Sequence, residues 1–169
     1  MLGVGRAQYL KGTDLFLEVI KKLHQMNSLG DIHFLWLGEL DSNYEIWMQR
    51  KYQKLPYKSH LHFLDFEENP AYIFAGSDIY LLTSRQDTYP STALEALANN
   101  TPVIMFSGTG GIEDILDGHN GSAVPYLDIQ AMADELLKWL SKEKIATPKE
   151  NNIYTYQDYL NKLLMVLNK

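Results

Sequence analysis

The chain has 169 residues, 46% of them hydrophobic and 21% charged, with no cysteine and a formal net charge of -6. This size fits one globular domain, and the acidic balance argues against general nucleic-acid binding, which depends on many Lys and Arg contacts to phosphate. The absence of cysteine excludes disulfides and thiolate chemistry and favours a reducing compartment, by default the cytoplasm. No run approaches the roughly 20 apolar residues that a membrane span requires, so the sequence predicts a soluble chain.

The first half of the chain alternates between short apolar runs and amphipathic stretches. Leu2 to Val4 is predicted to be a strand, and its position at the very start indicates that an upstream portion is missing. Apolar residues at three-and-four spacing predict a helix from Asp14 to Met26. Ile32 to Leu37 is a nearly continuous apolar run, as expected for a parallel strand covered on both faces. A mixed helix through Tyr44 to Tyr52 is predicted next.

The second half repeats this alternation. Strands are predicted at Leu61 to Leu64, Ile79 to Leu82, Val103 to Phe106 and, more weakly, Ala123 to Val124. Helices are predicted at Pro70 to Ala75, Thr92 to Ala98, Ile129 to Leu140 and Tyr154 to Leu167, with a polar connector from Ser141 to Asn152. The predicted fold class is α/β, with one domain over residues 1–169. Its core is a doubly wound, Rossmann-like parallel sheet of about six strands with helices on both faces.

Polar loops follow the carboxyl ends of the predicted strands, where ligands bind in sheets of this type. These loops start at Gly5, Gly38, Leu64, Ser84, Ser107 and Pro125. Because the carboxyl ends of parallel strands share one edge of the sheet, side chains that are distant in the sequence are expected to converge there. The candidates are Arg6, Lys11, Asp87 and Glu95.

Arg6 and Lys11 are candidate diphosphate ligands, because they lie between the end of the first strand and the start of the first helix. The third glycine of a dinucleotide fingerprint would fall at Gln8, whose side chain would crowd a pyrophosphate, so NAD binding is not expected. The alternative for each cation is ordinary surface solvation.

The segment from Asp87 to Glu95 places one carboxylate in a loop and a second one inside a helix. Amides at a helix start can hold phosphate, and a carboxylate can accept hydrogen bonds from the hydroxyls of a ribose or hexose. Two structural alternatives compete with this interpretation. Thr92 and Glu95 match a capping box, and Asp87 also fits a solvated loop acid. Spacing alone leaves both alternatives open.

Two glycine-containing segments come later in the chain. Gly110 and Gly111 precede a predicted helix and allow either close backbone approach to a ligand or a plain tight turn. Asp117 to Gly121 is a strong turn signal, and no function is assigned to it.

Histidine and lysine patterns suggest two further hypotheses. His60 and His62 are predicted to share one face of a strand, as a metal pair would. With no cysteine or third histidine nearby, packing is the preferred interpretation. The basic stretch from Arg50 to Lys58 has no intervening acid, which is typical of a solvated helix face. Contact with an anionic membrane surface is the alternative.

Several motifs in register, covering nearly the whole chain, resemble the retaining GT-B glycosyltransferases of family four (group 1 type), specifically their C-terminal donor-binding half. The matching segments are Val4-Gly5-Arg6, Lys11-Gly12, Leu61-His62-Phe63, Asp87 to Glu95, Thr101-Pro102-Val103, Gly110-Gly111-Ile112 and Asp117 to Gly121. The resemblance implies a domain that binds a nucleotide-diphosphate sugar and faces an N-terminal acceptor-binding domain. That partner half is absent from this chain, so the isolated chain is expected to be inactive.

The resemblance also assigns roles to individual residues. Arg6 and Lys11 would neutralise the diphosphate as it leaves, and Asp87 would contact hydroxyls of the donor sugar. These three are the implied catalytic residues. Glu95 would bind the ribose diol.

Further donor contacts are implied at the start of the helix and near the nucleotide base. Ser91 and Thr92 would offer backbone amides to the distal phosphate, and the loop from Leu64 to Phe66 would lie beside the base. No metal is expected, because fixed cations and helix-start amides can stabilise the leaving phosphate, and the chain has no Asp-x-Asp triplet.

The chain departs from the family pattern in three places. Asp87 stands where the family commonly has Glu, and Pro90 stands where a glycine is frequent. Asn99 and Asn100 replace the small residue and glycine that usually end the helix, although Asn100 can adopt the left-handed cap conformation. The shorter Asp87 side chain leaves the identity of the donor sugar open.

Two alternatives to glycosyl transfer remain, a sugar-nucleotide epimerase of the same fold and a non-catalytic nucleotide-binding module. A phosphate-accepting receiver domain is disfavoured, because the first strand lacks an acidic cluster at its end. The implied partners are the nucleotide-sugar donor, the missing acceptor domain and a membrane-surface or lipid-linked acceptor. The expected location is cytoplasmic, with peripheral contact to the inner membrane surface as an option.

Overall fold

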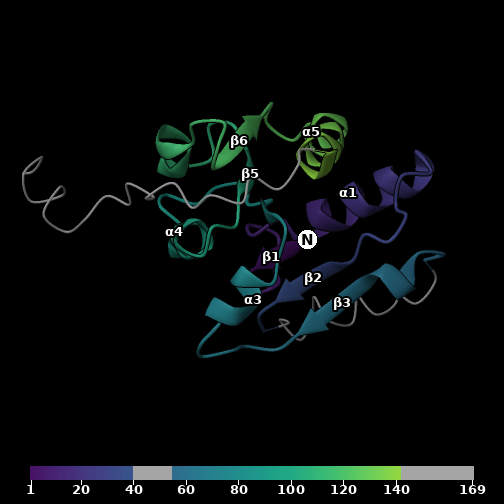
Figure 1. Ribbon diagram of the computed structural model, residues 1–169, viewed down its shortest axis with the longest axis horizontal. Coiled ribbons are helices and arrows are strands. Elements are labelled where there is room, and N and C mark those ends of the chain that lie inside the picture. Colours follow the sequence, from purple (N-terminus) through teal and green to yellow (C-terminus); the bar gives the residue numbers. More distant parts are fainter. Residues whose placement is uncertain (40–54, 142–169) are drawn as a thin grey trace, which may run out of the picture.

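The computed structural model describes residues 1–39 and 55–141. Within these ranges a six-stranded sheet with the order β3-β2-β1-β4-β5-β6 forms the centre of the molecule, and every neighbouring pair of strands is parallel (Figure 1). The strands are β1 (Leu2–Val4), β2 (Phe34–Leu37), β3 (Leu61–Leu64), β4 (Tyr80–Leu82), β5 (Val103–Phe106) and β6 (Gly121–Val124). The predicted doubly wound, Rossmann-like fold is confirmed.

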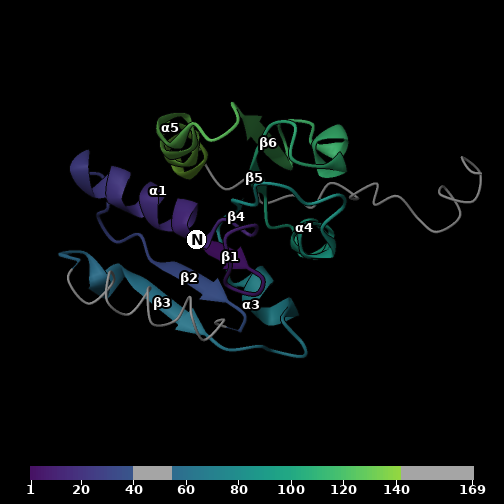
Figure 2. The same cartoon turned by 180° about the vertical axis from the view of Figure 1, so that it is seen from behind.

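Helices cover both faces of the sheet. They are α1 (Thr13–Gln25), α3 (Ala71–Ala75), α4 (Ser91–Ala98) and α5 (Ile129–Ser141), with the short 3-10 helices η1 (Lys58–His60) and η2 (Gly111–Ile115). α1 and α5 pack side by side on one face, and α3 and α4 pack on the other (Figures 1 and 2). Helices on both faces explain why the strands have nearly continuous apolar sequences.

Successive strand residues alternate between the two layers of core. In β4, Leu81 packs with α1 and α5, whereas Tyr80 and Leu82 pack with α3 and α4. In β5, Ile104 packs with α1 and α5, whereas Val103 packs with α3 and α4. All five side chains are at most 3% exposed. β4 and β5 are therefore buried on both faces, which leaves the strand ends as the accessible part of the central sheet.

The first helix shows how the apolar spacing of the sequence becomes core. Phe16, Ile20 and Leu23 are fully buried, and the Phe16 ring meets Trp36 edge to face with centroids 5.3 Å apart. Burying one such side chain contributes roughly 1.5–3 kcal/mol. A Cβ on Gly3 would lie 2.6 Å from the Trp36 ring, so a glycine is needed beneath it.

Predicted and observed bounds agree closely in the described residues, with one informative difference. β2 begins at Phe34 rather than Ile32, because the Ile32 amide donates to the Leu29 carbonyl at 2.8 Å in a turn before the strand. The helices predicted at 44–52 and 154–167 lie outside the described residues, as do most of the connector and of the basic stretch. Within residues 1–39 and 55–141, no helix is long and apolar enough to cross a membrane.

Candidate functional site

The candidate site lies where the sheet changes its winding direction. β1 and β4 are neighbours in the sheet, yet β1 leads into α1 on one face and β4 leads into α4 on the other. The connections therefore diverge beyond the carboxyl ends of these two strands, and ligands bind at such a switch point. The loops from Gly5 to Gly12 and from Thr83 to Pro90 form this edge.

An ion pair connects the two loops. Lys11 Nζ donates to Asp87 Oδ2 at 2.5 Å, and the two side chains are 31% and 16% exposed. The Ser84 hydroxyl donates to the same carboxylate oxygen at 3.5 Å. The structure thus brings two predicted site residues into contact across 76 sequence positions. Partial burial makes this attraction stronger than that of a fully solvated pair.

Gly12 explains how Lys11 reaches this position. Its φ is +68°, and a Cβ there would lie 1.9 Å from the carbonyl oxygen of Thr83. The Thr83 hydroxyl also donates to the Lys11 carbonyl at 3.3 Å. The loop therefore rests directly on the end of β4, which is possible only because residue 12 has no side chain.

The structure does not pair Arg6 with the acids of the candidate site. Arg6 follows β1 on the same loop as Lys11, but its ion-pair partner within the described residues is Glu39, with Nε 3.6 Å from Oε2. The two side chains are 56% and 64% exposed, so the pair is weak and solvated. The Arg6 guanidinium is thus accessible at the edge of the switch point.

The start of α4 differs from the capping-box alternative. α4 begins at Ser91 after Pro90, and no side chain among the described residues caps it. The Thr92 hydroxyl is hydrogen-bonded to the Tyr80 hydroxyl at 2.9 Å, and Glu95 is exposed one turn further on. The capping-box interpretation of Thr92 and Glu95 is wrong, because Thr92 lies inside the helix rather than at its cap.

Tyr80 contacts the start of α4 through the hydrogen bond between its hydroxyl and that of Thr92. Its side chain is fully buried, and burial is the main cause that raises the pKa of its hydroxyl above the ordinary value. The hydrogen bond with Thr92 acts in the opposite direction, and the negative charges of Asp87 and Glu95 raise the pKa further. Both carboxylates therefore act on one buried hydroxyl at the base of the candidate site.

The glycine pair after β5 packs against the loop that carries Asp87. A Cβ on Gly110 would lie 1.8 Å from the Asp87 carbonyl oxygen. The Asp87 amide donates to the Thr109 carbonyl at 2.8 Å, and the Gly111 amide donates to the Thr88 carbonyl at 3.0 Å. The structure therefore gives Gly110 and Gly111 a packing role against the chain's own backbone, and their approach to a ligand stays a prediction.

Glu113 holds this glycine loop from its other side and was not predicted as a site residue. Its carboxylate accepts hydrogen bonds from the Ser107 hydroxyl at 2.5 Å and from the Gly108 amide at 2.6 Å. The Gly108 amide, followed by the Ser107 hydroxyl, lowers the pKa of the Glu113 carboxyl below its ordinary value. The sequence contains one indication of this role: Ser107 and Glu113 flank the segment that contains Gly108, Gly110 and Gly111.

The loop that follows β3 begins at Leu64 and lies at the same carboxyl edge of the sheet as the candidate site. It is next to other strands, however. The Leu64 side chain is 47% exposed and Phe66 is 74% exposed, so the loop after β3 presents apolar surface to solvent. The Gly38 amide donates to the Leu64 carbonyl at 2.9 Å, which joins the ends of β2 and β3. β2 separates this loop from β1 and the switch point.

The histidine pair proposed from the sequence has a different setting. His60 lies in η1 rather than in β3, so it does not share a strand with His62. A third histidine is also nearby, contrary to the sequence-based expectation: His33 Nδ1 is 2.9 Å from His62 Nε2, and the His33 ring stacks on His60. His60 Nδ1 bonds the Ile32 carbonyl at 2.9 Å. No group of three or more His, Asp or Glu side chains in the described ranges is arranged to hold a metal ion.

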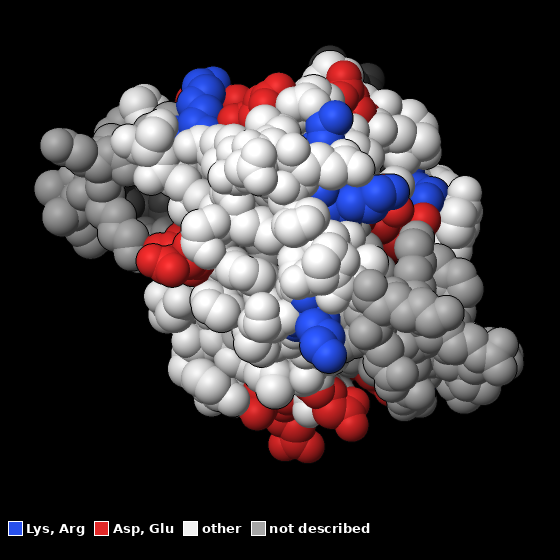
Figure 3. Space-filling view, turned by 90° about the vertical axis from the view of Figure 1, so that its right-hand side faces the viewer, with Lys and Arg blue, Asp and Glu red and all other residues white. Residues whose placement is uncertain are grey.

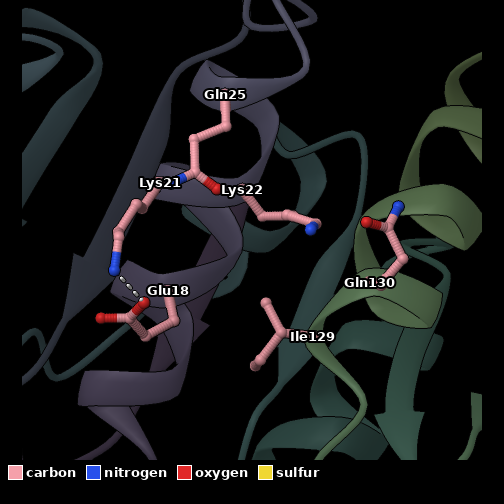
Figure 4. A pocket seen from close by; sticks show the side chains of 6 residues that line it. All are labelled: Glu18, Lys21, Lys22, Gln25, Ile129 and Gln130. Carbon is pink, nitrogen blue, oxygen red and sulfur yellow. Dashed lines mark hydrogen bonds and ion pairs between the residues drawn. The ribbon is translucent and has the colours of Figure 1, made fainter.

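The surface also has an open pocket between the later turns of α1 and the start of α5, with a volume of about 240 Å³. Its lining residues are Glu18, Lys21, Lys22, Gln25, Ile129 and Gln130 (Figure 4). Lys21 turns toward Glu18 and pairs with it at 2.8 Å. The pocket contains none of the predicted site residues, and it is separate from the Lys11–Asp87 pair.

Positive and negative side chains are interspersed on one face of the molecule. Figure 3 shows one face on which lysine, arginine and acidic side chains lie scattered among neutral residues. This face has no extended cationic area among its described residues. On this face, a phosphate group would therefore be bound by a few local groups rather than by a broad positive surface.

Comparisons of the sequence with known proteins give consistent results. A family model described as Glycosyl transferases group 1 matches residues 1–157. Over 92% of its length the chain is 30% identical to soluble starch synthase 1 of Solanum tuberosum, of which it covers 23%. Over 66% of its length it is 32% identical to a glycogen synthase of Hydrogenovibrio crunogenus, of which it covers 22%. The chain therefore spans about a quarter of the length of these relatives.

Solved structures with the same fold are also similar to this chain. TarM of S. aureus superposes with a TM-score of 0.80 at 21% identity, over 99% of this chain and 34% of that protein. Anabaena HepE in complex with UDP and glucose superposes with a TM-score of 0.72 at 16% identity, over 99% of this chain and 48% of that protein. These similarities show that the fold is that of GT-B glycosyltransferase domains.

Proposed function

Because the chain belongs to the family of group 1 glycosyl transferases, we propose that it is the donor-binding half of a retaining, family-four enzyme. It binds a nucleotide-diphosphate sugar, whose glycosyl group passes to an acceptor with retention of configuration. One observation carries this proposal: a lysine and an aspartate from different loops meet at the switch point between β1 and β4. That edge is where doubly wound sheets bind their ligands.

The proposed catalysis depends on charge that develops as the glycosidic bond breaks. Negative charge then builds on the departing diphosphate, so fixed cations stabilise the transition state more than the ground state. Lys11 and Arg6 supply these cations from the loop after β1. Ser91 and Thr92 offer backbone amides at the start of α4, where no described side chain competes for them and the helix dipole favours an anion.

The ion pair can hold both parts of the donor at once. A lysine ammonium has three donors, so Lys11 can keep its bond to Asp87 while it contacts a phosphate oxygen. Asp87 retains a second carboxylate oxygen, Oδ1, for hydroxyls of the sugar. Glu95, exposed on the next turn of α4, is proposed to bind the ribose diol. Leu64 is proposed to lie beside the base.

We propose that transfer needs no divalent metal. The sequence has no Asp-x-Asp triplet of the kind that clamps a diphosphate through a cation, and Lys11 and Arg6 supply positive charge instead. The remaining parts of the enzyme are proposals on the same basis. An acceptor-binding half would precede these residues, and the whole would act in the cytoplasm on an acceptor that can be carried by a membrane surface or a lipid.

Nucleotide binding by this chain tests the proposal directly. We expect one of UDP, ADP, GDP and CDP to raise the melting temperature, because ligand at about 100 times its Kd stabilises a protein by about 2.7 kcal/mol. Lys11→Ala should remove most of this shift. Lys21→Ala is the matched control, since Lys21 is also ion-paired but belongs to the separate pocket. Unchanged melting with all four diphosphates would contradict the proposal.

Saturation-transfer NMR with the corresponding sugar nucleotides would then identify the donor. Turnover belongs to the complete protein, where release of free nucleotide should require an acceptor. NMR of the product would show whether the anomeric configuration is retained. Nucleotide release without an acceptor, together with conversion of the sugar, would indicate the epimerase alternative.

A further inference from the structure

Arg85 makes a set of contacts that links three segments of the candidate site. Its Nη1 donates to the Tyr9 carbonyl at 2.6 Å and to Asp14 Oδ1 at 2.8 Å, and its Nη2 donates to Asp14 Oδ2 at 2.7 Å. The guanidinium also lies over the Tyr9 ring, 3.7 Å from its centroid. Arg85 thus joins the loop after β4 to the loop after β1 and to the first turn of α1.

The backbone of Arg85 reinforces the same connection. Its amide donates to the Leu10 carbonyl at 2.9 Å, so side chain and backbone hold two successive residues of the loop. Lys11 comes directly after these two residues, and Thr83 binds its carbonyl from the end of β4. The position of the Lys11 backbone is therefore determined largely by contacts from the residues around Arg85.

The geometry indicates that Arg85 acts on the loop rather than on a ligand. Its side chain is only 12% exposed and that of Asp14 is 24% exposed, in contrast to the 56% exposure of Arg6. A two-pronged pair between a guanidinium and a carboxylate has a fixed geometry as well as a high energy. A lysine cannot reproduce this fork while also bonding the Tyr9 carbonyl.

We propose that Arg85 is a positioning residue of the donor site, which holds the loop from Tyr9 to Gly12 so that Lys11 meets Asp87 and the donor diphosphate. This role rests on the proposed function. Asp14 is a second positioning residue, because its carboxylate fixes the orientation of the Arg85 guanidinium from the first turn of α1. Both residues act through Lys11 and do not touch the donor.

A double-mutant cycle on this chain tests the role. The measured quantity is the affinity for whichever of UDP, ADP, GDP and CDP binds the unsubstituted chain most tightly. Arg85→Lys keeps the charge but loses the fork, and we expect it to weaken binding about tenfold. In the Lys11→Ala background the same substitution should change affinity by less than about twofold, because its effect passes through Lys11.

Two further variants distinguish positioning from general stability. Ile20→Val removes one buried methylene on α1 at a distance from the loop and should lower the melting temperature while leaving nucleotide affinity unchanged. Asp14→Asn breaks the fork from its other side and should reproduce the loss of affinity, which keeps the test decisive if Arg85→Lys folds poorly. Equal loss of affinity in Ile20→Val would overturn the positioning role.

The remaining outcomes separate this inference from the function it rests on. If the unsubstituted chain binds none of the four diphosphates, the proposed function is overturned and the role of Arg85 is overturned with it. If the chain binds one of them and both Arg85→Lys and Asp14→Asn bind it as tightly, only the positioning role is overturned. The positioning role alone is also overturned if Arg85→Lys weakens binding as much in the Lys11→Ala background as in the unsubstituted chain.

Discussion

The two edges of the sheet both carry polar clusters, but they are built differently. At the carboxyl edge, charged partners come from distant parts of the chain: Lys11 and Asp87 are 76 positions apart, and Asp14 and Arg85 are 71 positions apart. At the amino edge, His33, which lies just before β2, shares a hydrogen bond with His62 in β3 across 29 positions, with no ion pair between them. Long-range ion pairs at one edge show that tertiary structure holds a specific arrangement of charge there.

The two edges also differ in the surroundings of their glycines that have a positive φ. Gly12 at the carboxyl edge combines a positive φ with a Cβ position only 1.9 Å from the Thr83 carbonyl oxygen. Gly118, in the turn before β6, has a similar φ of +75° with open space around it. The turn is satisfied locally, because the Asp117 carboxylate accepts from the amides of His119 and Asn120. Only the first glycine is required by a close approach of two loops.

The largest expected effect is that of Gly12→Ala. The new methyl group would collide with the backbone of Thr83 in addition to the cost of a positive φ, so we expect a loss of roughly 3–5 kcal/mol in unfolding free energy. Gly118→Ala should cost only about 1 kcal/mol, because strain acts there without a collision. Urea denaturation of both variants checks this difference, and equal losses would remove the distinction between the two regions.

Glu113→Gln is expected to have a smaller, pH-dependent effect. Because the folded pKa of Glu113 is lowered, its stabilising contribution is present above the ordinary value of 4.5 and is lost as the pH falls through the folded pKa. The substitution should therefore lower the unfolding free energy by about 1 kcal/mol at neutral pH. It should also make the unfolding free energy fall less steeply as the pH becomes acidic. Unfolding by urea between pH 3 and 7 gives the comparison.

The matched control for this prediction is Asp114→Asn. Asp114 is the next residue in η2 and is exposed, and it makes none of the hydrogen bonds to Ser107 and Gly108. If the unfolding free energy of Glu113→Gln falls at acidic pH as steeply as that of the unsubstituted chain, this carboxylate does not hold the glycine loop.

The smallest expected effect is that of Thr13→Val at the start of α1. The Thr13 side chain is fully buried, and its hydroxyl has no hydrogen-bond partner among the described residues. Replacing that hydroxyl by a methyl group of similar size should leave stability unchanged or raise it by up to about 1 kcal/mol. Thermal unfolding checks this, and a clear loss would reveal a partner for the hydroxyl.

Much of the fold could be predicted because its signals are local. Apolar runs of the right length marked β1, β3 and β5 at their observed bounds, and three-and-four spacing marked α1 and α5. Asn100 was expected to tolerate the left-handed conformation, and its φ is +58°. These features depend on neighbours in the sequence, so the sequence alone reveals them.

The candidate site was predictable only in part. The carboxyl edge and the residues Lys11 and Asp87 followed from the alternation of strands and helices, but the capping box at Thr92 was wrong. A threonine followed by a glutamate three positions later has the same sequence signature whether it caps a helix or lies inside one. Its actual partner, the Tyr80 hydroxyl, comes from a strand 12 positions away.

The amino-acid sequence by itself determined the strands, the helices and the edge at which their loops meet, because hydrophobic periodicity and glycine placement act over a few residues. Tertiary structure decided which charges at that edge face each other. It joined Arg85 to Asp14, turned Lys11 toward Asp87 and left Arg6 in solvent beside Glu39. Such pairings depend on distances between strands that are far apart in the chain, and no local pattern encodes those distances.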